Sequence, residues 1–116
     1  MKKVTLYGIP NCDSTIKAIK WLRQNNINFV FHDYKQSGIS KEKLQEWNSK
    51  AGWESFFNKR STTWRELSTA AQNKVTDFSS AIKIMMENSS IIKRPIIEFD
   101  NEIIIGFVEK EYQKLK

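Results

Sequence analysis

Cysteine and histidine are nearly absent from this chain, which has one of each in 116 residues. A single cysteine excludes an internal disulfide framework, and one Cys with one His cannot supply the ligands of a zinc site. Glycine is also scarce, and the four glycines are too scattered for a phosphate-binding loop or a dinucleotide fingerprint. We therefore expect neither a metal site nor a bound cofactor.

Long hydrophobic runs are missing as well. No apolar stretch approaches the ~20 residues that a membrane helix needs. The N-terminal MKKVTLYG has two lysines but lacks the apolar core and cleavage site of a signal peptide. These absences predict a cytoplasmic protein outside the membrane. With 40% hydrophobic and 28% charged residues, the composition is that of one globular domain over residues 1–116.

The net charge is +6, and basic residues outnumber acidic ones before residue 96 but not after it. Such an excess is compatible with nucleic acid, with an anionic small molecule, or with ordinary solvated lysines. We do not expect nucleic acid to be the partner.

The first part of the hydrophobic pattern predicts a βαβ unit. Val4–Tyr7 forms a short strand, a helix runs from about Ser14 to Asn25, and Phe29–Phe31 forms a second strand. Because a helix connects the two strands, they should be parallel.

A helical stretch over residues 37–90 follows. Ser40 can cap a helix that places Leu44 and Trp47 on one face, and a later helix should turn Met85 and Met86 inward. We interpret this stretch as an insertion into a core formed by residues 1–36 and 91–116.

The C-terminal part predicts a hairpin and a closing helix. Strands at Ile96–Phe99 and Ile103–Ile105 flank Asp100–Asn101, which is a good turn signal. Val108, Tyr112 and Leu115 then share one helical face. The complete order, βαβ, helices and ββα, defines an α/β class.

Cys12 follows the first strand and stands at the start of the first helix. The free N–H groups and partial positive charge of a helix N-terminus stabilise a thiolate and lower its pKa. A buried, inert cysteine is less favoured because Asn11, Asp13 and Ser14 are polar. A phosphatase would need an arginine to complete its phosphate cradle, and Ala18 occupies that position.

The whole chain resembles the ArsC-like family, the thioredoxin-fold group that contains glutaredoxin-coupled arsenate reductases and the Spx regulators. The resemblance rests on LYGIPNCDSTIKAIKWL, FHDYKQSGI, GWESFFNKRSTTWREL, MMENSSIIKRPII and IIGFVEKEY, in this order. Within the family it looks most like the YffB branch, which is thought to hold glutathione-dependent thiol reductases. It implies a thioredoxin-like fold with a four-stranded mixed sheet and a helical insertion.

The resemblance also implies site residues. Cys12 would be the catalytic nucleophile, and Arg60 and Arg94 would reach the thiolate pocket and bind an anionic group. Guanidinium groups stay charged and bind oxyanions or carboxylates bidentately. Pro95 would be cis and would align the preceding backbone to bind an extended thiol such as glutathione. The supporting residues would be Asn11, Asp13, Ser14 and Thr15.

Two positions depart from particular branches of the family. Thr15 stands where Spx-type redox switches carry the second cysteine of a C-x-x-C pair. Gly106 and Phe107 stand where arsenate reductases usually add a third basic residue, and no arginine follows Arg94. These departures argue against redox switching of the Spx type and against arsenate as substrate.

We therefore expect a thiol-dependent oxidoreductase, namely a monothiol reductase with glutathione as co-substrate. Glutathione or glutaredoxin would resolve the Cys12 adduct from outside. One alternative is a glutaredoxin-coupled arsenate reductase, and another is an Spx-like regulator that binds RNA polymerase. His32 is interpreted as a structural or exposed histidine, and Arg65 is left open as a site residue or a structural ion-pair partner.

Overall fold

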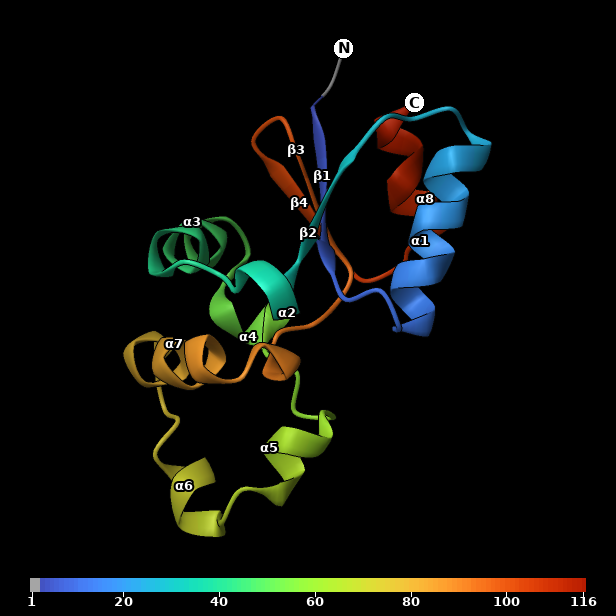
Figure 1. Ribbon diagram of the computed structural model, residues 1–116. Helices are drawn as coiled ribbons and strands as arrows, with labels where there is room; N and C mark the ends of the chain where they lie inside the picture. Colours follow the sequence, from blue (N-terminus) through green and yellow to red (C-terminus); the bar gives the residue numbers. More distant parts are fainter. Residues whose placement is uncertain (1–2) are drawn as a thin grey trace. The chain divides into compact units, whose positions relative to one another are not determined.

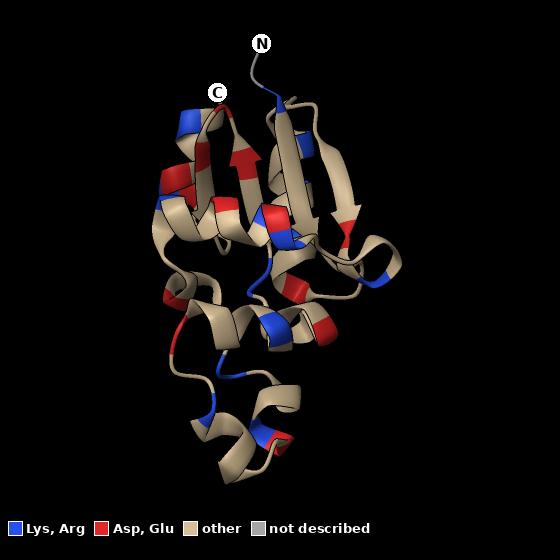
Figure 2. Cartoon of the chain, turned by 90° about the vertical axis from the view of Figure 1, so that its left-hand side faces the viewer, with Lys and Arg blue, Asp and Glu red and all other residues tan. Residues whose placement is uncertain are grey.

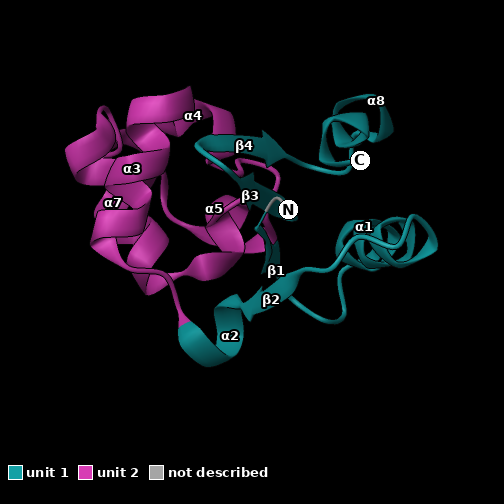
Figure 3. Ribbon diagram, turned by 90° about the horizontal axis from the view of Figure 1, so that it is seen from above, with its two compact units in different colours: residues 1–37, 94–116 teal, residues 38–93 magenta. Residues whose placement is uncertain are grey.

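The computed structural model describes residues 3–116 (Figure 1). The chain divides into two compact units (Figure 3). Residues 1–37 and 94–116 form the sheet unit, and residues 38–93 form the helical unit. Within the described part of the chain, no helix is both long and apolar enough to cross a membrane.

The sheet unit is built on a four-stranded mixed sheet with the order β2-β1-β3-β4. β1 (Val4–Gly8) pairs in parallel with β2 (Val30–Asp33), and α1 (Asp13–Gln24) connects them. β3 (Ile96–Phe99) runs antiparallel to both β1 and β4 (Glu102–Ile105). The α/β class, the parallel βαβ unit and the Asp100–Asn101 hairpin predicted from the sequence are confirmed.

One face of this sheet carries the hydrophobic core of the unit. α1 and α8 (Glu109–Tyr112), which continues into a 3-10 turn at Gln113–Leu115, lie on the same side of the sheet (Figure 1). Leu6, Ile97 and Ile104 are neighbours across the strands. Fully burying one such side chain contributes ~1.5–3 kcal/mol. The buried core residues are Val4, Leu6, Ala18, Trp21, Leu22, Ile97, Phe99, Ile104, Tyr112 and Leu115.

The helical unit has five short α-helices and no strand longer than a single bridge among its residues. The element bounds are α3 Lys41–Ala51, α4 Trp53–Phe56, α5 Thr62–Glu66, α6 Thr69–Asn73, α7 Phe78–Glu87 and a 3-10 turn at Ser89–Ile91. The short helix α2 (Tyr34–Ser37) belongs to the sheet unit. The buried side chains of the helical unit are chiefly Leu44, Trp47, Phe56, Phe57, Ile82, Met85, Ile91 and Ile92.

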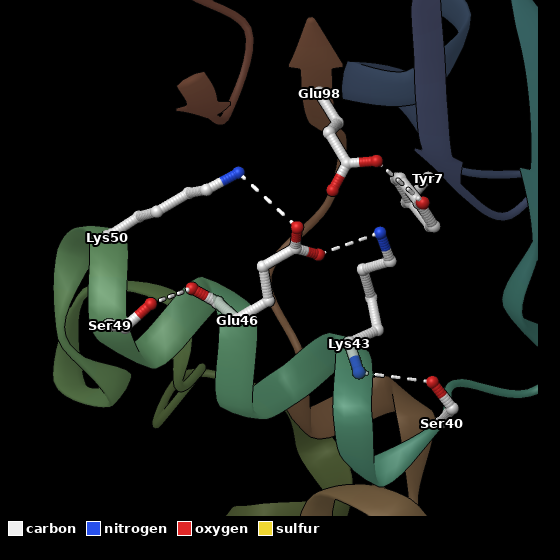
Figure 4. A network of polar contacts seen from close by, with 7 residues as sticks. All are labelled: Tyr7, Ser40, Lys43, Glu46, Ser49, Lys50 and Glu98. Atoms are coloured by element: carbon white, nitrogen blue, oxygen red, sulfur yellow. Dashed lines mark hydrogen bonds and ion pairs between the residues drawn. The ribbon is translucent and has the colours of Figure 1, made fainter. Parts of the chain in front are cut away.

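Side-chain caps define where these helices begin. The Ser40 hydroxyl accepts a hydrogen bond from the Lys43 N–H at 3.1 Å, as the sequence predicted (Figure 4). Further along α3, Glu46 forms ion pairs with Lys43 at 2.9 Å and Lys50 at 3.6 Å. Because these pairs are solvent-exposed, they contribute little to stability, about 0.3–0.5 kcal/mol each.

Two side chains predicted to face inward are instead exposed. Met85 is fully buried, but its neighbour Met86 is 48% exposed. Adjacent helical residues are rotated by ~100° around the axis, so only one of the two methionines can face the core. Val108 is 39% exposed because it is the N-cap of α8, just outside the helical face that it was expected to share.

Two buried tyrosines of the sheet unit provide a test of the packing. The Tyr112 hydroxyl donates a hydrogen bond to the Gly106 carbonyl at 2.9 Å, whereas the Tyr34 hydroxyl has no partner in the described residues. We expect Tyr112→Phe to lower the free energy of unfolding by about 1 kcal/mol and Tyr34→Phe to leave it unchanged or raise it. Urea titration of both variants measures the difference. Equal losses would contradict this prediction.

Candidate active site around Cys12

The end of β1 and the start of α1 approach each other closely. A Cβ atom added to Gly8 would lie 2.7 Å from Thr15 Oγ1, so any larger residue would force the Thr15 side chain to shift, and glycine is favoured at this strand end. Cys12 is the N-cap of α1, with extended backbone, and its carbonyl accepts a hydrogen bond from the Ile16 N–H at 2.9 Å. The partly exposed thiol therefore lies at the mouth of the helix.

The surroundings of the sulfur favour the thiolate. Burial raises the pKa of the Cys12 thiol, but the Thr15 N–H, the Thr15 hydroxyl, the Ser14 N–H and the Arg94 charge lower it, and the net shift is downward. Ser14 and Thr15 are in the first turn of α1, where backbone N–H groups have no helical partner. Cys12 makes no side-chain cap hydrogen bond, but these backbone donors lie close enough to favour the thiolate, which is a stronger acceptor than the neutral thiol.

Thr15 contributes more than the sequence indicated. Its side chain is fully buried, and its hydroxyl makes no hydrogen bond to another described group. The hydroxyl nevertheless acts on the sulfur and lowers its pKa. Because a neutral thiol is a weak acceptor, the hydroxyl gains a proper partner only when Cys12 is ionised. The position of Thr15 in the first turn after the cap is the sequence signal for this role.

Arg94 and Pro95 stand immediately before β3. β3 runs antiparallel to β1. The first residue of β3 therefore lies beside the C-terminal end of β1, where the Cys12 loop starts. The positive charge of Arg94 lowers the pKa of both the Cys12 thiol and the buried Tyr34 hydroxyl, although burial keeps the Tyr34 pKa well above its usual value. The Arg94–Pro95 peptide is cis, as the family resemblance implied. The Pro95 carbonyl accepts a hydrogen bond from the Gly106 N–H at 2.7 Å.

His32 belongs to an aromatic cluster on the sheet. It is the register partner of Tyr7, and their ring centroids are 4.8 Å apart. Tyr34 lies beside both rings, at 6.2 Å from His32 and 6.3 Å from Tyr7. The Tyr7 hydroxyl donates to Glu98 Oε1 at 3.2 Å (Figure 4). These contacts support the interpretation of His32 as a structural residue.

The two other arginines of interest are in the helical unit. Arg60 is exposed, and its N–H donates to Asn58 Oδ1 at 3.1 Å. Its side chain lines a cavity of about 310 Å³ within that unit. Arg65 lies exposed on α5 and makes no ion pair with a described acid. The structure therefore associates Arg94 with Cys12, and the predicted role of Arg60 toward the thiolate stays a prediction.

The remaining predicted residues surround the thiol on the exposed side. Asn11, Asp13 and Ser14 are exposed, and Asp13 begins α1. No cluster of three or more His, Cys, Asp or Glu side chains in residues 3–116 is arranged to hold a metal ion. The site as described is therefore a thiol at the N-terminus of a helix. An arginine acts on the thiol, and a cis proline lies at the same end of the sheet.

A mixed four-stranded sheet with this site defines a thioredoxin-like protein. A model of the ArsC family matches residues 7–115, and the chain belongs to that family. A solved YffB structure is 36% identical, with a TM-score of 0.92, over 97% of this chain and 98% of that one. An uncharacterized protein from Haemophilus influenzae is 46% identical over 95% of this chain and 96% of its own length.

A third similar protein is named as a transcriptional regulator. The global transcriptional regulator Spx from Streptococcus agalactiae is 33% identical over 93% of this chain and 79% of its own length. The family placement, the thioredoxin-like fold and the presence of YffB and Spx relatives agree with the resemblance seen in the sequence.

The role assigned to Thr15 can be tested by a substitution that keeps its shape. We expect Thr15→Val to raise the pKa of Cys12, because it removes one hydroxyl donor to the thiolate. Ser14→Ala is the matched control, since only the backbone N–H of Ser14 acts on the sulfur, and it should leave the pKa unchanged. The pH dependence of the alkylation rate measures both. If the valine variant has the same midpoint as the parent, the Thr15 hydroxyl does not stabilise the Cys12 thiolate.

The same shift predicts a pH dependence of stability. Because the pKa of Cys12 is lower in the folded protein, the unfolded chain binds more protons between the folded value and the free-thiol value of ~8.5. The stabilisation from the thiolate is therefore fully present above ~8.5 and lost as pH falls through the folded pKa. Relative to Cys12→Ser, the parent should gain stability with rising pH across this window in thermal melts. A difference that does not depend on pH would contradict the lowered pKa.

Proposed function

We propose that this protein is a glutathione-dependent monothiol reductase. Membership of the ArsC family supports a thiol-dependent reductase in general terms. The observation that carries the finer proposal is the stabilised thiolate of Cys12 in a chain with a single cysteine. Because the chain has no second thiol, an external thiol must resolve any adduct on Cys12.

The chemistry consists of two thiol–disulfide exchanges. The Cys12 thiolate attacks the glutathione sulfur of a mixed disulfide, the S–S bond breaks, and the substrate sulfur leaves as a thiolate. A second glutathione thiolate, or that of a glutaredoxin, then attacks the glutathione sulfur on Cys12. This step releases the Cys12 thiolate and a new disulfide, so the substrate is reduced and the external thiol is oxidised. A low pKa serves both steps, since it keeps Cys12 ionised and makes it a good leaving group.

Arg94 provides the anion recognition that such a substrate needs. It carries a permanent charge near the Cys12 sulfur, and glutathione brings carboxylates that guanidinium groups bind well. The backbone before Pro95 lies at the same end of the sheet as Cys12 and would bind the extended part of glutathione. The family resemblance adds Arg60 as a second predicted anion ligand. The proposed reaction suits the cytoplasm, where free glutathione is abundant.

The arsenate alternative is weaker for an electrostatic reason. An arsenate ester on Cys12 would carry several negative charges on a compact group. Gly106 and Phe107 follow β4, and no arginine lies beyond Arg94 to neutralise more of that charge. Each missing charge-assisted contact costs roughly 1.5–3 kcal/mol, or about one to two decades in affinity.

A second candidate is a regulator of the Spx kind that binds RNA polymerase. The observation that favours it is the relative named Spx at 33% identity. Binding of this kind would not require the thiol. Co-purification with RNA polymerase that persists in Cys12→Ser would support the regulator, whereas loss of reductase activity in the same variant would support the enzyme.

Mass spectrometry separates the glutathione reaction from the arsenate reaction. We expect glutathione disulfide to add one glutathione to Cys12, and we expect weak or absent arsenate turnover even with glutaredoxin supplied. Arg94→Ala should slow adduct formation about 10- to 100-fold through loss of the anion contact and a raised thiol pKa. Arg94→Lys should restore it only in part because lysine lacks the planar fork.

Arg65→Ala is the matched control, since Arg65 is an exposed arginine to which the proposed reaction gives no role. It should react like the parent. Robust glutaredoxin-dependent arsenate reduction with no glutathione adduct would refute the proposal and favour the arsenate alternative.

A further inference from the structure

Tyr34, the first residue of α2, carries a buried hydroxyl group that neither the fold nor the proposed reaction explains. Its side chain is 2% exposed, and the hydroxyl makes no hydrogen bond to a described group. Phenylalanine would fill nearly the same volume without burying a polar atom, and unsatisfied buried groups are rare in folded proteins. A buried hydroxyl that the packing does not use points to a partner that moves toward it when a ligand binds.

Tyr34 leaves the sheet where the Cys12 loop begins. Asp33, the last residue of β2, is paired in parallel with Gly8, the last residue of β1. The residue after Gly8 enters the loop that carries Cys12, and the residue after Asp33 is Tyr34. Because parallel strands end at the same end of a sheet, Tyr34 and the Cys12 loop start side by side.

Arg94 reaches the same end of the sheet from the other side of β1. Ile96, the first residue of β3, is paired with Tyr7, so Arg94 stands just beyond the end of β1. In the order β2-β1-β3, one strand separates the chain at Tyr34 from the chain at Arg94. Two strand spacings are roughly 10 Å, a span that a tyrosine and an arginine side chain can bridge together.

The ring of Tyr34 packs beside residues of both β1 and β2. Its centroid is 6.3 Å from that of Tyr7 on β1 and 6.2 Å from that of His32 on β2. The Arg94 charge lowers the pKa of the Tyr34 hydroxyl, whereas burial raises this pKa well above its ordinary value. The hydroxyl is therefore neutral under working conditions and lies within electrostatic reach of the guanidinium.

A neutral hydroxyl is suited to hold an arginine that must bind an anion. A guanidinium group has five N–H donors and no acceptor, and a bidentate bond to a carboxylate uses two of these donors. The Tyr34 oxygen can accept from one of the others. A carboxylate in the same place would offset the positive charge and weaken the attraction for an anionic ligand. A tyrosine orients the guanidinium and leaves its charge for the ligand.

We propose that Tyr34 is a positioning residue for Arg94. When Arg94 binds a glutathione carboxylate, its guanidinium donates a hydrogen bond to the Tyr34 hydroxyl oxygen. The inference rests on the proposed function, since it takes glutathione as the ligand of Arg94. Tyr34 is itself buried and does not touch the ligand, so it acts on glutathione recognition and has no part in the exchange of sulfur bonds.

Two disulfides of different charge test the proposal. The rate of adduct formation on Cys12 is measured with glutathione disulfide and with 2-hydroxyethyl disulfide, which has no carboxylate, at a pH above the free-thiol pKa of ~8.5. We expect Tyr34→Phe to slow the reaction with glutathione disulfide about five- to tenfold, because Arg94 loses its anchor. The reaction with the uncharged disulfide should stay within about twofold of the parent.

Two comparisons assign the effect to Arg94. Tyr7→Phe is the matched control, since it removes a hydroxyl of the same aromatic cluster that is bonded to Glu98, and it should react like the parent. In an Arg94→Ala background, Tyr34→Phe should cause no further loss, because the group that it positions is absent. Thermal melts show that each variant is folded.

Three results would overturn the proposal while leaving the reductase intact. The first is a Tyr34→Phe variant that reacts with glutathione disulfide like the parent, and the second is equal slowing with both disulfides. The third is a loss from Tyr34→Phe that is as large in the Arg94→Ala background as in the parent. A parent protein that forms no glutathione adduct would instead refute the proposed function, and this inference with it.

Discussion

The close approach of Gly8 to Thr15 is the constraint on which the candidate active site depends. A Cβ atom at Gly8 would lie 2.7 Å from the Thr15 hydroxyl oxygen, so any other residue there would require the buried Thr15 side chain to shift. With glycine there, the first turn of α1 sits against the end of β1. This contact fixes the short loop between them, and the loop carries Cys12. The position of the Thr15 side chain, which acts on the thiol, therefore depends on glycine at the end of β1.

Opposing electrostatic effects act on the pKa of Cys12. Burial raises the pKa of the thiol, and donors from Thr15 and Ser14 together with the Arg94 charge lower it by more. Thr15 stands where a C-x-x-C pair would have its second cysteine. The hydroxyl replaces a resolving thiol with a hydrogen-bond donor, so the thiolate is stabilised but cannot close an internal disulfide. A reductase built this way depends on an outside thiol, and this dependence follows from the chemistry of one side chain.

The helical unit contributes a different kind of surface. An antiparallel bridge joins Phe57 to Ile92 in this unit, and Lys93, Arg60 and Trp53 line the same cavity. Arg94 is the next residue after Lys93, but it belongs to the sheet unit and acts on Cys12. Two adjacent basic residues therefore belong to two different units. The sequence motif that contains both shows no sign of this division.

Local interactions explain what the sequence by itself determined. Three features depend on residues within a few positions of one another: the Asp100–Asn101 turn, the Ser40 cap and the position of Cys12 at the start of the first helix. Local sequence patterns therefore predict them without knowledge of the fold. Tertiary structure alone decided which distant residues meet. The antiparallel pairing of β3 with β1 puts Arg94 near Cys12. Packing of the helix buries Met85, whereas Met86 stays exposed. These outcomes depend on chain direction and helix rotation, which sequence spacing constrains only weakly.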